Sequence, residues 1–149
     1  MKRKHILFLL LAILLLCALL LNRRPGYASV MEANWGITLP TAAQWQEVYT
    51  TDSGPSPHGD GWRYHVYAYG IEAPVAEMVP WSATEGEAIF HSSYSEETEF
   101  WLDALEVPEN RRPDYTACAF WYDWQTDNSQ IILCWDAGCS TLYVLESFI

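Results

Sequence analysis

Positive charge is almost absent from most of this chain. Beyond residue 24 there is no lysine, and the cations there are Arg63, Arg111 and Arg112. All 19 Asp and Glu residues lie in the same stretch, so three positive and nineteen negative charges give residues 25–149 a net charge of −16. A surface of that sign repels phosphate groups and anionic headgroups. The composition therefore excludes nucleic acid as a partner and disfavours recognition of a lipid surface by residues 25–149.

Paired-cysteine motifs are also absent. Apart from Cys17 the chain has Cys118, Cys134 and Cys139, and no two cysteines are separated by two residues. A zinc ribbon or a thioredoxin-like redox site is therefore not indicated. The three cysteines beyond residue 24 leave two interpretations. Either one internal disulfide forms and one thiol stays free, or the cysteines are buried as small apolar side chains.

The first 24 residues differ from the rest of the chain. Residues 6–21 form an uninterrupted apolar run of 16, preceded by Lys2, Arg3 and Lys4. A charged start followed by such a run predicts an export signal in residues 1–24. As a helix at about 1.5 Å per residue, the run would reach ~24 Å, which is slightly short for a membrane span.

The sequence leaves the fate of this leader open. Arg23 and Arg24 follow the run directly, which favours a retained single-pass anchor in the cell membrane with the C-terminal domain outside. The small residues up to Ala28 favour cleavage there, which would secrete the domain. A lipid-modified Cys17 is a third outcome. Residues 25–40 show no periodicity and are expected to act as a tether.

The remaining residues, 41–149, are expected to form one domain. Half of the chain is apolar, and all eight tryptophans lie beyond residue 24. A chain of this size buries roughly two thirds of its surface on folding, which excludes disorder. Internal repeats and low-complexity tracts are not found.

The pattern of apolar residues predicts an α+β fold, mainly an antiparallel sheet of about five strands with one helix near 95–107. Strands are expected at 44–51, for which a short helix is the alternative, at 62–69, and in a C-terminal three-stranded meander at 115–125, 130–136 and 140–147. Between them we expect one helical turn near 75–78 and a short strand at 88–91.

The expected helix has a start signal and an apolar stripe. Ser93 or Ser95 would cap it, with glutamates in the first turn. Its buried stripe is predicted to comprise Phe100, Ala104 and Val107, widened by Trp101 and Leu105.

The meander has a predicted register. A two-residue turn at 127–128 would place Tyr122 opposite Leu133 and Phe120 opposite Trp135, on the core face. The face of the third strand stays open, because a bulge at the Gly138 loop decides whether Leu142 and Val144 or Tyr143 and Leu145 are buried.

One loop carries a resemblance. Asp52-Ser53, then His58-Gly59-Asp60-Gly61 leading into an aromatic strand, then a terminal hairpin ending in TLYVLE at 141–146, resembles a group of short uncharacterised proteins of Gram-positive bacteria. Those proteins have an N-terminal export or anchor segment, an HGDG loop between two strands and a C-terminal strand of the type NTLYYFE. The resemblance implies this organisation and no assigned activity, and Pro55 and Pro57 stand where the group has glycines.

The same loop holds the candidate site residues. His58, Asp60 and His65 could converge on zinc or iron, since two imidazoles and a carboxylate suit either metal. The alternative is structural: Asp60 or Asp52 accepts hydrogen bonds from loop amides, and His58 bonds within the loop. We favour the structural reading and expect no cofactor. If this region binds a partner, the candidate binding residues are Asp52, His58, Asp60, Trp62 and His65.

Three functions fit these observations. The first is a non-catalytic extracytoplasmic domain, tethered or secreted, that binds an envelope or surface protein, because an acidic, aromatic-rich surface steers cationic partners. The second is an acidic inhibitor or immunity-type protein that covers a basic site. The third is a metal-dependent hydrolase built on His58, Asp60 and His65.

Overall fold

A computed structural model describes most of the chain but not residues 1–25, 41–44, 55–59, 71–73 and 83–93. The chain divides into two compact units, Met1–Leu39 and Pro40–Ile149. The expected anchor at 6–21, the capping residue Ser93 and the expected strand at 88–91 lie outside the described residues. Within those residues, no helix has the length and apolarity needed to cross a membrane.

The described part of the first unit contains a helix, α2, at Tyr27–Trp35. It ends at Gly36, whose φ of 68° is left-handed and whose N–H donates to the Glu32 carbonyl at 2.9 Å. Glycine after the last turn is a common helix stop. A helix was not among the predicted elements at 25–40, where the residues show no periodicity, and Gly36 was not recognised as a stop signal. The tether role of this segment stays a prediction.

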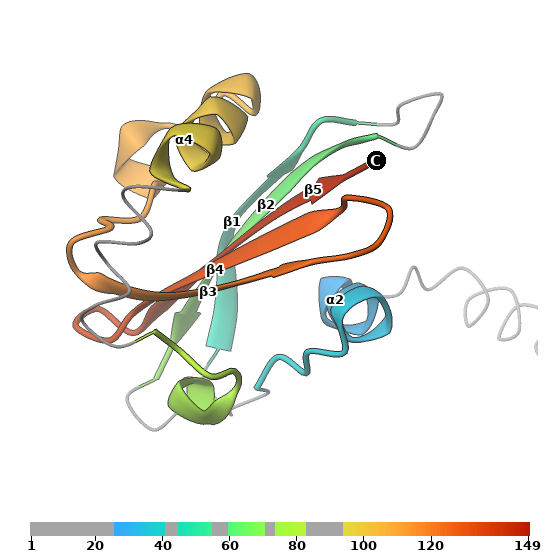
Figure 1. The fold of residues 1–149 in the computed structure, drawn as a ribbon. Coiled ribbons are helices and arrows are strands. Elements are labelled where there is room, and N and C mark those ends of the chain that lie inside the picture. The colour runs from blue at the N-terminus through green and yellow to red at the C-terminus, as the bar shows by residue number, and fades with distance from the viewer. Residues whose placement is uncertain (1–25, 41–44, 55–59, 71–73, 83–93) are drawn as a thin grey trace, which may run out of the picture. The chain divides into compact units, whose positions relative to one another are not determined.

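The second unit is built on a five-stranded antiparallel sheet in the order β1-β2-β5-β4-β3 (Figure 1). The strands are β1 (Trp45–Asp52), β2 (Gly61–Tyr69), β3 (Cys118–Trp124), β4 (Gln130–Asp136) and β5 (Thr141–Phe148). The helix α4 (Ser95–Ala104) and two 3₁₀ turns, η1 (Pro74–Glu77) and η2 (Glu109–Arg111), complete the described elements. The predicted α+β class, the five strands and the C-terminal meander are confirmed, and the helical alternative for 44–51 is wrong.

The register between β3 and β4 differs from the prediction by one residue. Tyr122 lies opposite Ile132 and Phe120 opposite Cys134. The connecting loop has three residues, closed by a hydrogen bond from the Gln125 amide to the Ser129 carbonyl at 2.9 Å. Because Asn128 adopts a left-handed φ of 69° in the loop, the turn holds one residue more than expected.

That single residue exchanges the faces of β4. Leu133 and Trp135 therefore point away from Phe120 and Tyr122, not toward them as predicted.

The face of the sheet that α4 covers, called here the helix face, holds the main core (Figure 1). The sheet contributes Tyr64, Val66, Phe120, Ile132, Cys134 and Leu145, and the helical segment contributes Trp101, Leu102, Leu105 and Val107. The opposite face is also buried, with Tyr67, Leu133, Leu142 and Val144 almost inaccessible. Because β5 lies in the middle of the sheet, both of its faces are covered: Leu142 and Val144 are buried on one, and Leu145 is buried beside half-buried Tyr143 on the other.

The predicted stripe is confirmed at Trp101, Leu105 and Val107 and is wrong at Phe100 and Ala104. Thr98, Trp101 and Leu102 are the buried residues of α4, whereas Phe100 is 61% exposed and Ala104 is also exposed. The helix begins after Tyr94, which makes no side-chain capping bond, so the predicted cap at Ser95 is wrong. The larger burial available to Trp101 and Leu102 decides the orientation.

The three described cysteines are free thiols. Cys134 is buried, Cys118 is half-buried and Cys139 is exposed in the turn between β4 and β5. Burial raises the pKa of the Cys118 thiol to about 12 and that of Cys134 well above its usual value. Cys134 is thus a small apolar core residue, one of the two readings of the sequence.

Candidate binding site

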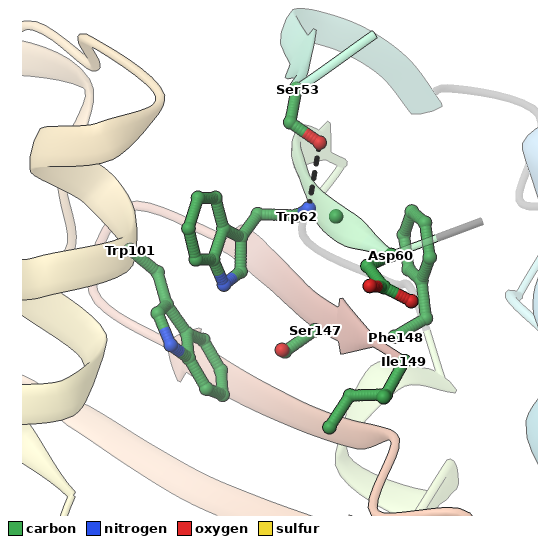
Figure 2. A pocket seen from close by; sticks show the side chains of 8 residues that line it. Ser53, Asp60, Trp62, Trp101, Ser147, Phe148 and Ile149 are labelled. Atoms are coloured by element: carbon green, nitrogen blue, oxygen red, sulfur yellow. Dashed lines mark hydrogen bonds between the residues drawn. The ribbon is translucent and has the colours of Figure 1, made fainter. Parts of the chain in front are cut away.

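A pocket of about 510 Å³ opens at the end of the sheet where β2 begins and β5 ends (Figure 2). Its lining comes from the β1 to β2 connection, β2, α4 and the C-terminal end: Ser53, Asp60, Gly61, Trp62, Trp101, Ser147, Phe148 and Ile149. The pocket forms because β2 and β5 pair, with Gly61 opposite Phe148 and Trp62 opposite Ser147.

Hydrogen bonds fix the backbone on one side of this pocket. The Trp62 amide donates to the Ser53 hydroxyl at 2.9 Å, and the Ser53 amide donates to the Trp62 carbonyl at 2.9 Å. Asp52 accepts from the Gly54 amide at 2.8 Å, where Gly54 takes a left-handed φ of 74°. The predicted amide-capping role is therefore seen at Asp52.

Gly61 allows the close approach of these segments. A Cβ atom at this position would lie 2.2 Å from the Ser53 hydroxyl oxygen and 3.3 Å from the Phe148 ring. The first contact is a clash that would force the Ser53 side chain to move, and the second is tight, so glycine at this position lets the two segments approach without rearrangement.

Aromatic rings make the pocket walls. Figure 2 shows the indoles of Trp62 and Trp101 on one side, with Asp60 and Phe148 on the other. Trp101 is buried in the core, and Trp62 is half-buried with its ring edge-to-face on exposed Phe100, at 5.9 Å between centroids. Rings held in this way offer rigid apolar surface to a ligand.

The charged group of the pocket is the exposed carboxylate of Asp60. Among the described residues, none forms an ion pair with it. The nearest cation in the sequence, Arg63, lies over the Phe148 ring at 4.9 Å and pairs with Glu146 at 3.2 Å. Because Glu146 neutralises Arg63, the pocket keeps a negative charge.

The predicted site residues separate into two groups. Asp60 and Trp62 line the pocket, and Asp52 lies one residue before its wall. His65 is three residues after Trp62 on β2 and therefore points to the opposite face of the sheet. His58 lies outside the described residues.

His65 joins β1 to β2 on that opposite face. Its Nδ1 lies 2.5 Å from the Glu47 carboxylate and 3.0 Å from the Thr50 hydroxyl, and its ring stacks on Tyr67 at 6.0 Å. Burial lowers the pKa of His65, although Glu47 opposes that effect. A neutral imidazole whose Nδ1–H donates to Glu47 fits this arrangement, which is a structural contact between strands.

A metal site is not seen in the part of the chain that the structure describes. There, no three His, Cys, Asp or Glu side chains come close enough together to hold an ion. The proposed cluster also needs His58, so the metal hypothesis stays a prediction.

Three pocket residues, Trp101, Ser147 and Phe148, were not predicted from the sequence. Trp101 carried a signal only for the core, and Phe148 fell beyond the predicted end of its strand. Their place in the pocket depends on the pairing of β2 with β5, which is about 80 residues distant along the chain and leaves no local pattern.

Comparisons with protein-family models, curated protein sequences and solved structures find no match.

Proposed function

We propose that residues 40–149 form a non-catalytic domain that binds another protein outside the cytoplasmic membrane. The observation that carries the proposal is the pocket itself, in which two indole walls face the Asp60 carboxylate within a strongly acidic stretch of chain. The leader at 1–24 supports the location, because a charged start and an apolar run are typical of exported proteins.

The chemistry of the pocket suits a basic side chain of the partner. A guanidinium group can stack on the Trp62 ring and donate hydrogen bonds to the Asp60 carboxylate. The net charge of −16 over residues 25–149 would attract a basic partner from a distance and raise its association rate. Arginine fits better than lysine, since its planar group uses both the ring and the carboxylate.

The hydroxyls of the pocket favour binding over catalysis. The Ser53 oxygen already accepts the Trp62 amide, so it serves the backbone. His65, the histidine that the structure describes, points to the other face of the sheet. A nucleophile needs a base within hydrogen-bond reach, and neither serine has one among the described residues.

A blocked pentapeptide with one arginine among glycines tests the proposal. Its binding is followed by the tryptophan fluorescence of the intact protein, with the citrulline peptide as a neutral analogue of the same shape. We expect the arginine peptide to bind in the millimolar range, the citrulline peptide to bind at least tenfold more weakly, and added salt to weaken only the former.

Matched variants localise the effect. Asp60→Asn should weaken arginine binding about tenfold by removing a charged acceptor, and Trp62→Leu should abolish the fluorescence change. Glu109→Gln removes an exposed acid that does not line the pocket and should leave binding unchanged. Equal binding of the arginine and citrulline peptides, or no binding at all, would overturn the proposal.

A further inference from the structure

A row of four side chains crosses the sheet from the pocket to its far edge. Strand pairing places Trp62 beside Ser147, Ser147 beside Gln130, and Gln130 beside Trp124. All four belong to the helix face, because each is an even number of residues away from a core residue of its own strand. We call them the cross-strand row.

The row has aromatic ends and a polar middle. Its two indoles are three strand spacings apart, or about 14 Å at ~4.8 Å per spacing. Trp124 is 59% exposed, and Tyr122 stands beside it with the ring centroids 6.5 Å apart and is itself 41% exposed. The far end of the row is therefore a second exposed aromatic surface on the same face as the pocket.

Gln130 in the middle of the row has an unused acceptor. Its Oε1 atom is buried, and within the described residues nothing donates a hydrogen bond to it. A buried carbonyl oxygen without a donor is unfavourable. Because Gln130 as a whole is only half-buried, turning its amide toward the surface would let a ligand N–H supply the missing donor without displacing a partner from the protein.

We propose that the cross-strand row binds an extended segment of the partner polypeptide, with a basic side chain in the pocket and an apolar side chain on Trp124. This inference rests on the proposed function, since the pocket fixes one end of the segment. A backbone N–H between the two side chains would donate to Gln130.

The spacing of the row sets the spacing of the ligand. An extended chain rises about 3.3 Å per residue, so four residues span the distance between the two indoles. Side chains four residues apart also point to the same side of an extended chain. The preferred segment therefore has a basic residue at position i and an apolar residue at i+4.

Charge favours a polypeptide over a glycan as the occupant. Aromatic platforms bind both classes, but a neutral sugar chain offers nothing to Asp60 or to the net charge of −16. A basic peptide matches both, and its amides supply the donor that Gln130 lacks.

The test uses the full protein and three blocked glycine heptapeptides with arginine as the second residue. One has leucine as the sixth residue, one has leucine as the fourth, and one has no leucine. We expect the peptide with the i+4 spacing to bind at least tenfold tighter than the other two by calorimetry. Trp124→Ala and Gln130→Leu should each reduce that gain several-fold and leave the binding of the leucine-free peptide unchanged.

Trp121→Ala is the matched control, because Trp121 lies on the same strand as Trp124 but on the opposite face of the sheet. It should leave the gain intact. Equal affinity of the three peptides would overturn this inference and leave the proposed function standing, whereas no binding of the leucine-free peptide would overturn the proposed function itself. Binding of N-acetylglucosamine tetrasaccharide that depends on Trp124, with no gain from the i+4 peptide, would show that the row takes a glycan and not a polypeptide.

Discussion

Glu146 on β5 accepts a hydrogen bond from the guanidinium group of Arg63 on β2 at 3.2 Å, although the Glu146 side chain is only 2% exposed. The two residues lie directly opposite each other in the strand pairing. A buried carboxylate is costly unless a cation compensates it. The pair therefore helps to hold Arg63 over the ring of Phe148, a residue of the pocket lining, with its charge compensated by Glu146.

Removing the arginine should expose the cost of this arrangement. Arg63→Met leaves the Glu146 carboxylate buried without its cation, and we expect the free energy of unfolding to fall by about 3 kcal/mol in urea titrations. The double variant Arg63→Met with Glu146→Leu removes both charges and should recover most of the loss. A loss below about 1 kcal/mol for the single variant would show that Glu146 does not depend on Arg63.

His65 should make stability depend on pH. Burial lowers the pKa of the folded histidine below the value of 6.5 that applies in the unfolded chain, with Glu47 and Glu146 opposing the shift and Arg63 assisting it. As the pH falls below 6.5, the unfolded chain binds a proton that the folded protein resists, so stability is lost. The slope cannot exceed about 1.4 kcal/mol per pH unit for one group.

Urea titrations between pH 7.5 and 5.0 measure this slope. His65→Gln keeps a donor for Glu47 and removes the titration, so we expect a shallower dependence in that variant. Stability that increases toward acid pH in the wild type, and not in the variant, would instead indicate a charged His65 paired with Glu47.

Gly61 and Ser53 should be coupled. The Cβ atom of Gly61→Ala would meet the Ser53 hydroxyl, which must move and release the Trp62 amide. We expect a loss of about 1–3 kcal/mol in the free energy of unfolding, together with weaker arginine-peptide binding. In a double-mutant cycle, Ser53→Ala should cost less in the Gly61→Ala background than in the wild type, because the hydrogen bond to the Trp62 amide is already lost there and removing the hydroxyl relieves the clash. Strict additivity of the two changes would contradict this packing.

The sequence predicted the elements of this fold better than their contacts. The alternation of side chains in β2 and the periodic stretch at 95–107 are local signals, and both produced the expected element. The stripe of α4 was predicted too wide: Trp101 is buried as expected, whereas its neighbour Phe100 is exposed, because only one of two adjacent rings can face the sheet. The pocket was foreseen only at Asp60 and Trp62, since its other wall arrives through the pairing of β2 with β5.

The β3 to β4 register shows how one backbone conformation decides many contacts. The residues at 127–128 suit either a two-residue or a three-residue loop, and the left-handed φ of Asn128 selects the longer one. Trp135 consequently lies on the face opposite Phe120, half-buried, with its ring edge-to-face on Tyr69 at 6.2 Å. The sequence contains both options, so only the structure distinguishes them.

Two double-mutant cycles test this register directly. The ring contact predicts a coupling energy of about 0.5–1.5 kcal/mol between Trp135→Ala and Tyr69→Ala, whereas Trp135→Ala and Phe120→Ala, on opposite faces, should be additive. Because Trp135 is only half-buried, Trp135→Ala should cost less than Leu133→Ala, for which we expect about 2–5 kcal/mol at a fully buried site. Strong coupling of Trp135 to Phe120 and none to Tyr69 would restore the two-residue turn. It would also reverse the face of Gln130, and the cross-strand row would then lose its middle residue.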